Sequence, residues 1–370
     1  MAAPKETIWN LDPHTKAKHD ILCNYLQAWF PILSTWHGRI IYYDGFAGPG
    51  RYKGGEIGSP LIALNVAKTH QGKLARDLVF VFVESDKRRA KHLESEIVAL
   101  KPPKRFHCYI ENKDFETALR ETLDSIQEKG LQIAPTFAFV DPFGIKGLPF
   151  ELIERLLSNP HCEVLITFMN VTLRRFADVI PKRINELLGH SDAADRLSAL
   201  HTAKERVILA RQLYAKSLER QARFVRYFAM RDKKDQELYD LFFATNHSKG
   251  HEKMKTAMWR LDETGNYSFS DGVDPDQATL FTSTPERDFA PILWERFRGQ
   301  TVYSDEVLQY TWDKTAFLDK HAKGALRLLE AEEGFKGHSI EVDSKKADGD
   351  PRRRNTYPKG VRITFEDKES

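Results

Sequence analysis

The sequence predicts an α/β fold in which a doubly wound, mostly parallel sheet is followed by a small C-terminal domain. Five apolar runs typical of buried strands alternate with helical patterns over the first half of the chain, an order that builds a parallel sheet. Two further runs, FVRYFAM and ELYDLFFAT, flank the turn residues DKKDQ and predict a hairpin that adds an antiparallel strand. We therefore expect seven strands in the large domain.

The elements of this domain follow one another in a regular order. Residues 1–37 form an N-terminal segment with an amphipathic helix between His19 and Trp36. The first strand, RIIYYD, runs into GFAGPG, and Ser59-Pro60 marks the start of the next helix. The other four parallel strands are expected in DLVFVFVES, RFHCYIE, TFAFVD and EVLITFM. The large domain therefore covers residues 38–262, with a helical insertion at about 173–220.

Polar, turn-rich residues at 263–287 predict a linker to a C-terminal domain at 288–370. This domain has three helical stretches, FAPILWERFRG, SDEVLQYTW and LDKHAKGALRLLEAEEG, and then two short strands, SIEV and VRITF. The basic stretch KKADGDPRRRNTYPKG lies between the two strands. Three helices with a two-stranded basic ribbon indicate a winged helix, an elaborated helix-turn-helix.

The composition excludes several classes of protein. No apolar run approaches the roughly 20 residues of a membrane-spanning helix, and the N-terminus lacks the apolar core of a signal peptide, so we expect a cytoplasmic location. Cys23, Cys108 and Cys162 are far apart, which argues against a disulfide framework or a metal site built by this chain alone. The net charge is only +3, so nucleic-acid binding would depend on local basic patches.

The end of the first strand carries an acid and a glycine-rich loop that suit a bound cofactor. Asp44 is followed by Gly45, Phe46, Gly48 and Gly50. This spacing is not the GxGxxG of nicotinamide sites. It is similar to the first motif of S-adenosylmethionine-dependent methyltransferases, whose cofactor needs close backbone approach and an acid near its cationic end.

Two more acids follow the next two strands. Glu84 lies where a carboxylate would accept both ribose hydroxyls, and Asp114, with Phe115 beside it, lies where the adenine amino group would be recognised. Each acid could instead be a helix cap. Three acids after three successive strands favour a cofactor crevice at the carboxyl ends of the strands.

The fourth strand ends in Asp141-Pro142-Phe143-Gly144. The motif resembles the Asp/Asn-Pro-Pro-aromatic motif of amino-directed nucleic-acid methyltransferases, and more closely the Asp-Pro-Phe-Gly of the tRNA guanine dimethyltransferase family. An exocyclic amine is a poor nucleophile, and Asp141 with the Pro142 carbonyl could accept its hydrogens while Phe143 stacks on the base and Gly144 permits its approach. A simple β-turn also fits these residues. Their place after the fourth strand favours the catalytic interpretation.

The stretches DGFAGPG, FVDPFG and ATNHSKGHEKMKTAMWRLD resemble the three-Cys-motif partner protein family, TcmP, over roughly residues 12–365. The resemblance implies a methyltransferase-like, Rossmann-like fold and a winged-helix-like tail. The family name implies a partner, a three-cysteine protein that resembles radical S-adenosylmethionine enzymes. It does not indicate the substrate.

The leading hypothesis is an S-adenosylmethionine-dependent methyltransferase that acts on an exocyclic amino group of a nucleic-acid base, guanine or adenine. The alternative is a nucleic-acid-binding partner of the three-cysteine protein that keeps a degenerate methyltransferase fold. Candidate substrate contacts are Gly144 of the motif above, for which a turn is the alternative, and Arg174, Arg175, Asn246 and Lys249, for which a solvated cap is the alternative. Arg352, Arg353 and Arg354 are further candidates, and they could instead lie on a solvated hairpin of a protein-interaction module. The winged helix itself could bind nucleic acid or protein, with Tyr357 available for stacking.

Overall fold

The computed structural model describes residues 4–33, 36, 38–70, 77–144, 148–170, 179–263, 266–271, 284–331 and 333–366. The chain divides into two compact units. The first contains residues 1–261 and 268–274, and the second contains residues 262–267 and 275–370.

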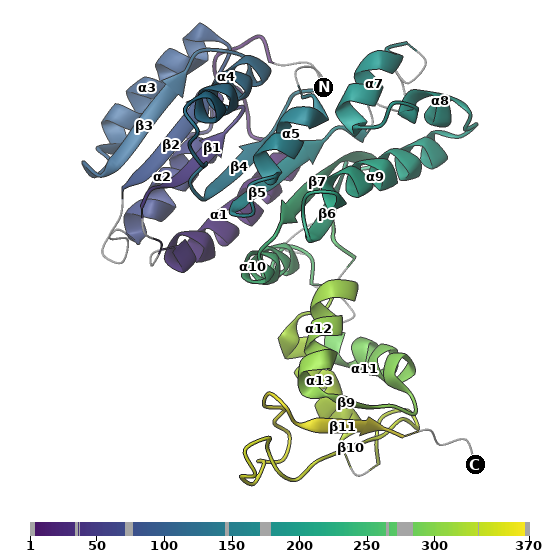
Figure 1. The fold of residues 1–370 in the computed structure, drawn as a ribbon. Coiled ribbons are helices and arrows are strands. Elements are labelled where there is room, and N and C mark those ends of the chain that lie inside the picture. Colours follow the sequence, from purple (N-terminus) through teal and green to yellow (C-terminus); the bar gives the residue numbers. More distant parts are fainter. Residues whose placement is uncertain are drawn as a thin grey trace. The chain divides into compact units, whose positions relative to one another are not determined.

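The first unit is built on one mixed sheet (Figure 1). Within the described residues its strands lie in the order β3-β2-β1-β4-β5-β7-β6-β8. Strands β1 to β5 are parallel neighbours, and β7 pairs antiparallel with both β5 and β6. The strands are β1 (Ile40–Asp44), β2 (Leu78–Val83), β3 (Phe106–Glu111), β4 (Thr136–Val140), β5 (Cys162–Phe168), β6 (Phe224–Arg231), β7 (Glu237–Thr245) and β8 (Ser268–Ser270).

The expected parallel sheet and the antiparallel hairpin strand are confirmed, but the expected number of seven strands is wrong. The eighth strand, β8, comes from the polar stretch assigned to a linker, and it pairs parallel with β6. Its three residues carry no run of apolar side chains, because a short strand at the edge of a sheet has little surface to bury. Composition alone therefore did not distinguish it from a turn.

Helices connect the strands and cover the sheet. Helix α1 packs against α2 and α10, while α5 packs against α4 and α7. The expected insertion after β5 contains α7, α8 and α9 in its described part. The helices of this unit are α1 (Pro13–Ile32), α2 (Ser59–Thr69), α3 (Lys87–Leu100), α4 (Phe115–Glu128), α5 (Phe150–Leu157), α7 (Pro181–Leu188), α8 (Ala193–Ser198), α9 (Ala203–Glu219) and α10 (Ser248–Trp259).

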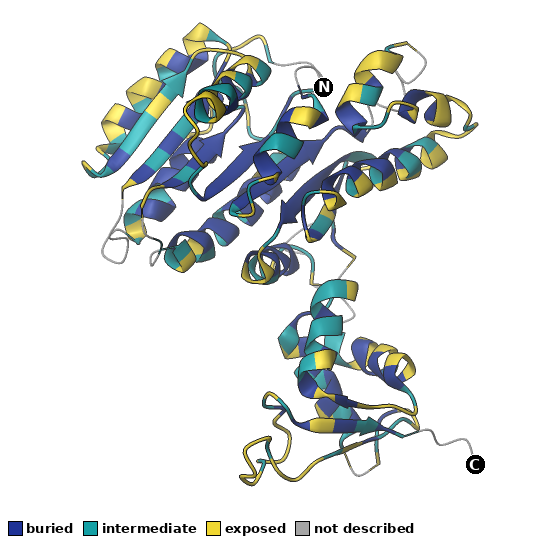
Figure 2. Ribbon diagram, in the orientation of Figure 1, coloured by how far each residue is buried: buried dark blue, intermediate teal, exposed yellow. Residues whose placement is uncertain are grey.

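The middle of the sheet forms the core of this unit. Every residue of β4 and β5 is buried, as the dark strands of Figure 2 show. Both strands are mostly apolar on both faces rather than alternating, with Glu163 and Thr167 as buried polar exceptions in β5, because helices cover both faces of a parallel sheet. The edge strand β3 is only partly buried.

In its described residues, the second unit contains three helices and a small antiparallel sheet in the strand order β10-β11-β9. The sequence predicted two of these strands, and the third, β9, is a three-residue segment that pairs with β11. In chain order the elements are α11 (Pro285–Phe297), β9 (Thr301–Tyr303), α12 (Ser304–Lys314), α13 (Asp319–Leu329), β10 (Ile340–Val342) and β11 (Arg362–Phe365).

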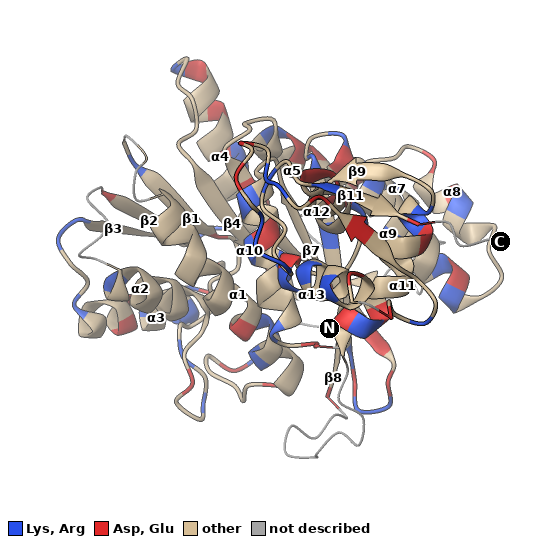
Figure 3. Cartoon of the chain, turned by 90° about the horizontal axis from the view of Figure 1, so that it is seen from below, with Lys and Arg blue, Asp and Glu red and all other residues tan. Residues whose placement is uncertain are grey.

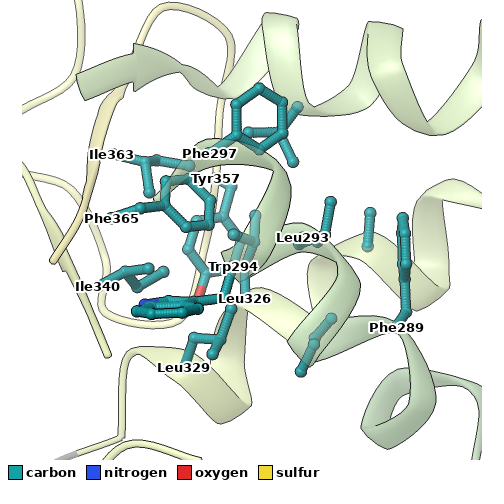
Figure 4. Close-up of a cluster of buried hydrophobic side chains, with 14 of the residues drawn as sticks. Phe289, Leu293, Trp294, Phe297, Leu326, Leu329, Ile340, Tyr357, Ile363 and Phe365 are labelled. Carbon is teal, nitrogen blue, oxygen red and sulfur yellow. The ribbon is translucent and has the colours of Figure 1, made fainter. Parts of the chain in front are cut away.

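A separate hydrophobic core holds the second unit together (Figure 4). Phe289, Leu293 and Phe297 of α11 pack with Leu326 and Leu329 of α13 and with residues of the small sheet. Tyr357, expected to be available for stacking on a nucleotide, is also part of this core, and its hydroxyl donates to Glu330 Oε2 at 2.6 Å. The stacking hypothesis for Tyr357 is therefore wrong.

Basic and acidic residues are interspersed along the chain (Figure 3), in keeping with the small net charge. Among the described helices, none has both the length and the apolar character required to cross a membrane.

Candidate active site

The acids predicted from the sequence meet at one edge of the sheet. Asp44 ends β1, and it aligns with Phe82 of β2 and Phe139 of β4. Because the three strands are parallel neighbours, Glu84 and Asp141 follow the carboxyl ends of β2 and β4 on either side of Asp44. Binding sites of doubly wound sheets lie at this edge.

The glycine loop after β1 is tied to the neighbouring strands through its backbone. Gly45 N–H donates to Phe139 O at 2.8 Å, Ala47 N–H to Val83 O at 2.9 Å, and Gly48 N–H to Glu84 Oε2 at 3.0 Å. Gly48 and Gly50 have φ values of +64° and +81°, which favour glycine strongly. These amides are used inside the protein, so they do not form the cradle that a pyrophosphate requires.

Gly45 is required for a different reason, the lack of space for a side chain. A Cβ atom at this position would lie 2.5 Å from the ring of Phe115, which is buried and stacks on Phe46 with ring centroids 5.3 Å apart. The structure therefore brings three predicted cofactor residues into direct contact. Phe115 supports the loop from the start of α4.

Asp44 has no solvent exposure. Its carboxylate accepts hydrogen bonds from Tyr42 Oη at 3.2 Å and from Phe46 N–H at 3.3 Å. Burial raises the pKa of Asp44 to about 7, and the charge of Asp141 acts in the same direction, although the hydrogen bonds oppose the shift. A buried acid that titrates near neutrality is typical of a functional site and is also found in structural networks.

Glu84 is buried and holds the loop and the start of α3 together. Its Oε2 accepts from Gly48 N–H, and its Oε1 accepts from Asp86 N–H at 2.7 Å. Burial raises the pKa of Glu84 above its ordinary value, and the backbone hydrogen bonds and Arg89 oppose the shift. Both oxygens retain one further lone pair for a ligand hydroxyl.

Asp114 is the N-cap of α4, as the alternative interpretation of this acid expected. Its Oδ1 accepts from Thr117 N–H at 2.9 Å, and its Oδ2 accepts from the Thr117 hydroxyl at 2.8 Å. The backbone hydrogen bond from Thr117 lowers the pKa of Asp114. A role in adenine recognition stays a prediction.

Asp141 forms an ion pair that the sequence analysis did not anticipate. Lys18 of α1 donates from Nζ to Asp141 Oδ2 at 2.6 Å, and the Lys18 side chain is only 5% exposed. Phe143, two residues further on, meets Trp9 edge to face with ring centroids 5.8 Å apart. Pro142 is buried, and Gly144, the last residue of the motif, is partly exposed.

The N-terminal segment forms part of this site. Trp9 also contacts Tyr52 edge to face, with centroids 5.7 Å apart, and its carbonyl accepts from Lys53 N–H. The guanidinium of Arg89 lies 4.9 Å from the Trp9 ring centroid. Lys18, Trp9 and Tyr52 thus join Asp141 and Phe143. The sequence contained one indication that Lys18 is buried: it lies one helical turn before Leu22, on the apolar face of α1.

Asn246 and Lys249 do not join the site. They follow the end of β7, and β7 runs antiparallel to β5, with Ala244 aligned to Val164 near the start of β5. They therefore lie at the amino ends of the parallel strands, the edge opposite Asp141. Asn246 caps local backbone groups there, accepting from Arg223 N–H and donating to Gln221 O. Lys249 is largely exposed.

The remaining predicted substrate contacts differ from one another. Arg174 and Arg175 lie outside the described residues. The side chain of Arg352 is 5% exposed and is paired with Glu330, and it also donates to the backbone oxygens of Asp343 and Thr356. Its predicted contact with nucleic acid is therefore wrong, because the side chain braces the loop from inside. Arg353 and Arg354 are exposed.

The strand order β3-β2-β1-β4-β5-β7-β6 with β7 reversed is that of a methyltransferase-type, Rossmann-like fold. No protein-family model matches the chain, and no curated protein is similar to it in sequence. The TcmP resemblance therefore stays a prediction.

Several solved structures are similar to part of the chain. An O-methyltransferase from Bacillus cereus in complex with SAH is 14% identical over 60% of this chain and 80% of its own, with a TM-score of 0.33. A putative O-methyltransferase from Klebsiella pneumoniae is 13% identical over 64% and 91%, with a TM-score of 0.33. A co-crystal structure of WbdD with the kinase inhibitor LY294002 is 10% identical over 62% of this chain and 40% of that one, also with a TM-score of 0.33. Such low values identify neither a substrate nor a family for this chain.

Proposed function

We propose that this protein is an S-adenosylmethionine-dependent methyltransferase that acts on an exocyclic amino group of a nucleic-acid base. The observation that carries the proposal is the position of Asp141-Pro142-Phe143. The motif follows β4, next to the end of β1 and its glycine loop. An acceptor for amine hydrogens and an aromatic ring thus adjoin a candidate cofactor crevice.

The chemistry of the crevice suits this cofactor. Asp44 and Glu84 are buried carboxylates, which match an ammonium group and ribose hydroxyls rather than a phosphate. The loop amides are occupied by protein acceptors, which disfavours a nicotinamide dinucleotide. When bound, S-adenosylmethionine supplies a methyl group activated by a sulfonium.

The residues of the motif would bind and orient the substrate. Asp141 and the Pro142 carbonyl accept hydrogen bonds from the amine, which turns its lone pair out of conjugation with the ring. Phe143, with Trp9 beside it, provides an aromatic surface for the base. The Asp141 side chain is 22% exposed, so a proton released from the amine can pass through it to solvent.

Replacing Glu84 with glutamine should weaken binding of S-adenosylmethionine by about 1.5–3 kcal/mol, because one charge-assisted hydrogen bond to the ribose is lost. Glutamine keeps one acceptor, for either Gly48 N–H or Asp86 N–H, so it perturbs the loop less than alanine, which keeps none. Isothermal titration measures the affinity. Glu111→Gln, at the exposed end of β3, is the matched control and should bind as the parent does. Equal affinity of Glu84→Gln and the parent would remove the ribose assignment.

The second unit supports a nucleic-acid substrate. Its helix and strand order fits the proposed winged helix, and α13 carries Lys320, Lys323 and Arg327 at a spacing that places them on one face. Arg327 Nε donates to the carbonyl of Asn355, directly after the exposed Arg353 and Arg354. The basic face of α13 is thus connected to the basic loop between β10 and β11. This surface fits a phosphate backbone.

Binding of nucleic acid should weaken steeply as salt rises, and the double variant Arg353→Ala/Arg354→Ala should flatten the slope of log K against log salt by about 1.4–1.8. Fluorescence anisotropy with a labelled tRNA and a labelled DNA duplex measures the slope. Arg296→Ala, an exposed arginine of α11, serves as the control. Parallel slopes for the double variant and the parent would favour a protein partner for this unit, such as the three-cysteine protein.

The alternative is a nucleic-acid-binding partner that keeps the fold without catalysis. Asp44, Glu84 and Asp141 are all in place at one edge of the sheet, which favours an enzyme. Nucleic-acid binding without affinity for S-adenosylmethionine would reverse this preference.

A further inference from the structure

Lys18 reaches the candidate active site from a helix that precedes the sheet in sequence. The first turns of α1 are fixed there, because the Tyr239 hydroxyl donates to the His14 carbonyl at 3.3 Å. One turn later, Lys18 Nζ lies 2.6 Å from Asp141 Oδ2 and 5.2 Å from the centroid of the Tyr239 ring. Further along the helix, Tyr25 donates to the buried Glu163 of β5. Helix α1 therefore presents Lys18 from a rigid support.

Stability alone does not explain this ion pair. Removing an ammonium and a carboxylate from water is costly, and apolar residues of similar volume often stabilise a protein equally well or better. A buried lysine on the acid that ends β4 is therefore better explained by function. The neighbouring His19 is also buried, and burial, followed by the charge of Lys18, lowers its pKa to about 3. His19 is thus neutral at physiological pH, and Lys18 is the cation that faces Asp141.

The pair has two consequences for the acid. Lys18 donates to Oδ2, and among the described residues no donor contacts Oδ1. The ion pair therefore fixes the orientation of the carboxylate and leaves Oδ1 available to accept from a ligand. The pair also has no net charge. Asp141 alone would place a negative charge near the buried Asp44, and the charge of Asp141 is one of the causes that raise the pKa of Asp44, after burial.

We propose that Lys18 is a positioning residue that orients Asp141 and compensates its charge next to the methyl group to be transferred. The proposal rests on the proposed function, since it assumes that S-adenosylmethionine binds between the ends of β1 and β4. In that place Lys18 prevents an unpaired carboxylate from holding the sulfonium too tightly before transfer. The sulfide product has no such charge.

The test compares the affinities of the full chain for S-adenosylmethionine and for S-adenosylhomocysteine by isothermal titration. The preference is the affinity for S-adenosylmethionine divided by the affinity for S-adenosylhomocysteine. Lys18→Met should raise this preference by about 5- to 10-fold, because the uncompensated carboxylate attracts the sulfonium and not the sulfide. Asp141→Asn should lower the preference, because Lys18 is then unpaired. The double variant Lys18→Met/Asp141→Asn should return close to the parent.

Two controls define the role of charge. Lys18→Arg keeps the cation and should retain the parent's preference. Lys16→Met removes a lysine that is exposed and paired with Asp20, and it should have no effect. If Lys18→Met does not fold, Asp141→Asn and the double variant can still be compared, since they differ only at position 18. The double variant must then have the higher preference for S-adenosylmethionine.

The outcomes separate the two proposals. Suppose that the parent binds both compounds. If Lys18→Met then has the same preference as the parent, or the double variant has the same preference as Asp141→Asn, the role of Lys18 is overturned while the proposed function stands. If the parent binds neither compound, both proposals fail.

Discussion

Replacing Asp141 with alanine is expected to reduce methyl transfer at least about 100-fold, the effect of removing one well-placed polar group from an active site. The same change should lower the free energy of unfolding by about 3–5 kcal/mol, because it leaves the ammonium of Lys18 buried without its partner. Transfer of a labelled methyl group to tRNA and DNA measures the first effect, and urea denaturation measures the second.

The double variant Lys18→Met/Asp141→Ala separates these effects. It removes both charges, so stability should recover, whereas activity should not. Recovery of activity together with stability would mean that Asp141 has only a structural role. Asp141→Asn should be intermediate, because the amide keeps an oxygen that can accept a hydrogen bond from the amine.

Replacing Arg211 with methionine is expected to destabilise the fold by about 3–5 kcal/mol. Arg211 of α9 donates to both oxygens of Asp240, at 2.9 and 2.8 Å, and Asp240 has no solvent exposure. Asn170, two residues after the end of β5, donates to the same carboxylate. Among the described residues, the change leaves this buried carboxylate with one neutral donor, Asn170. Thermal and urea denaturation measure the loss.

The stability that Arg211→Met loses should depend on pH in a defined direction. Burial already raises the pKa of Asp240, and Arg211 opposes this shift, so removing Arg211 raises the folded-state pKa further. A carboxyl with a raised folded pKa costs stability as pH rises from its unfolded value towards the folded one. The difference in stability between the variant and the parent should therefore be smallest near the unfolded pKa of about 4 and should grow as pH rises above it. Arg196→Met, from an exposed pair with Asp192, should change stability by at most about 1 kcal/mol at any pH.

The sequence predicted the elements that are long and strongly apolar. Strands β1 to β5 and the hairpin of β6 and β7 are such segments, and the acids that end β1, β2 and β4 meet because parallel neighbours share an edge. Strands β8 and β9 were not predicted, since three residues carry too little pattern. Their pairing depends on the strands beside them.

The candidate site was predicted only where its residues follow strands. Lys18 precedes Asp141 by 123 positions, and no local pattern connects a helix residue to a strand end so far along the chain. Asn246 and Lys249 follow the second strand of the predicted hairpin, and the sequence did not show which of the two hairpin strands is the reversed one. Within the run Arg352 to Arg354, the residue types are identical, and only packing shows that the first is buried while the other two are exposed.

The pairing of β8 with β6 has a practical consequence for dissecting this protein. Residues 262–267 belong to the second unit, yet the following residues through 274 belong to the first, so no single cut in the chain separates the two. A fragment ending at residue 261 lacks β8 and leaves β6 as an unprotected edge strand, a template for aggregation. A fragment starting at residue 275 lacks Tyr267, whose hydroxyl donates to the Ala316 carbonyl at 2.8 Å. Fragments for separate study should therefore overlap in this stretch, with both copies of residues 262–274 retained.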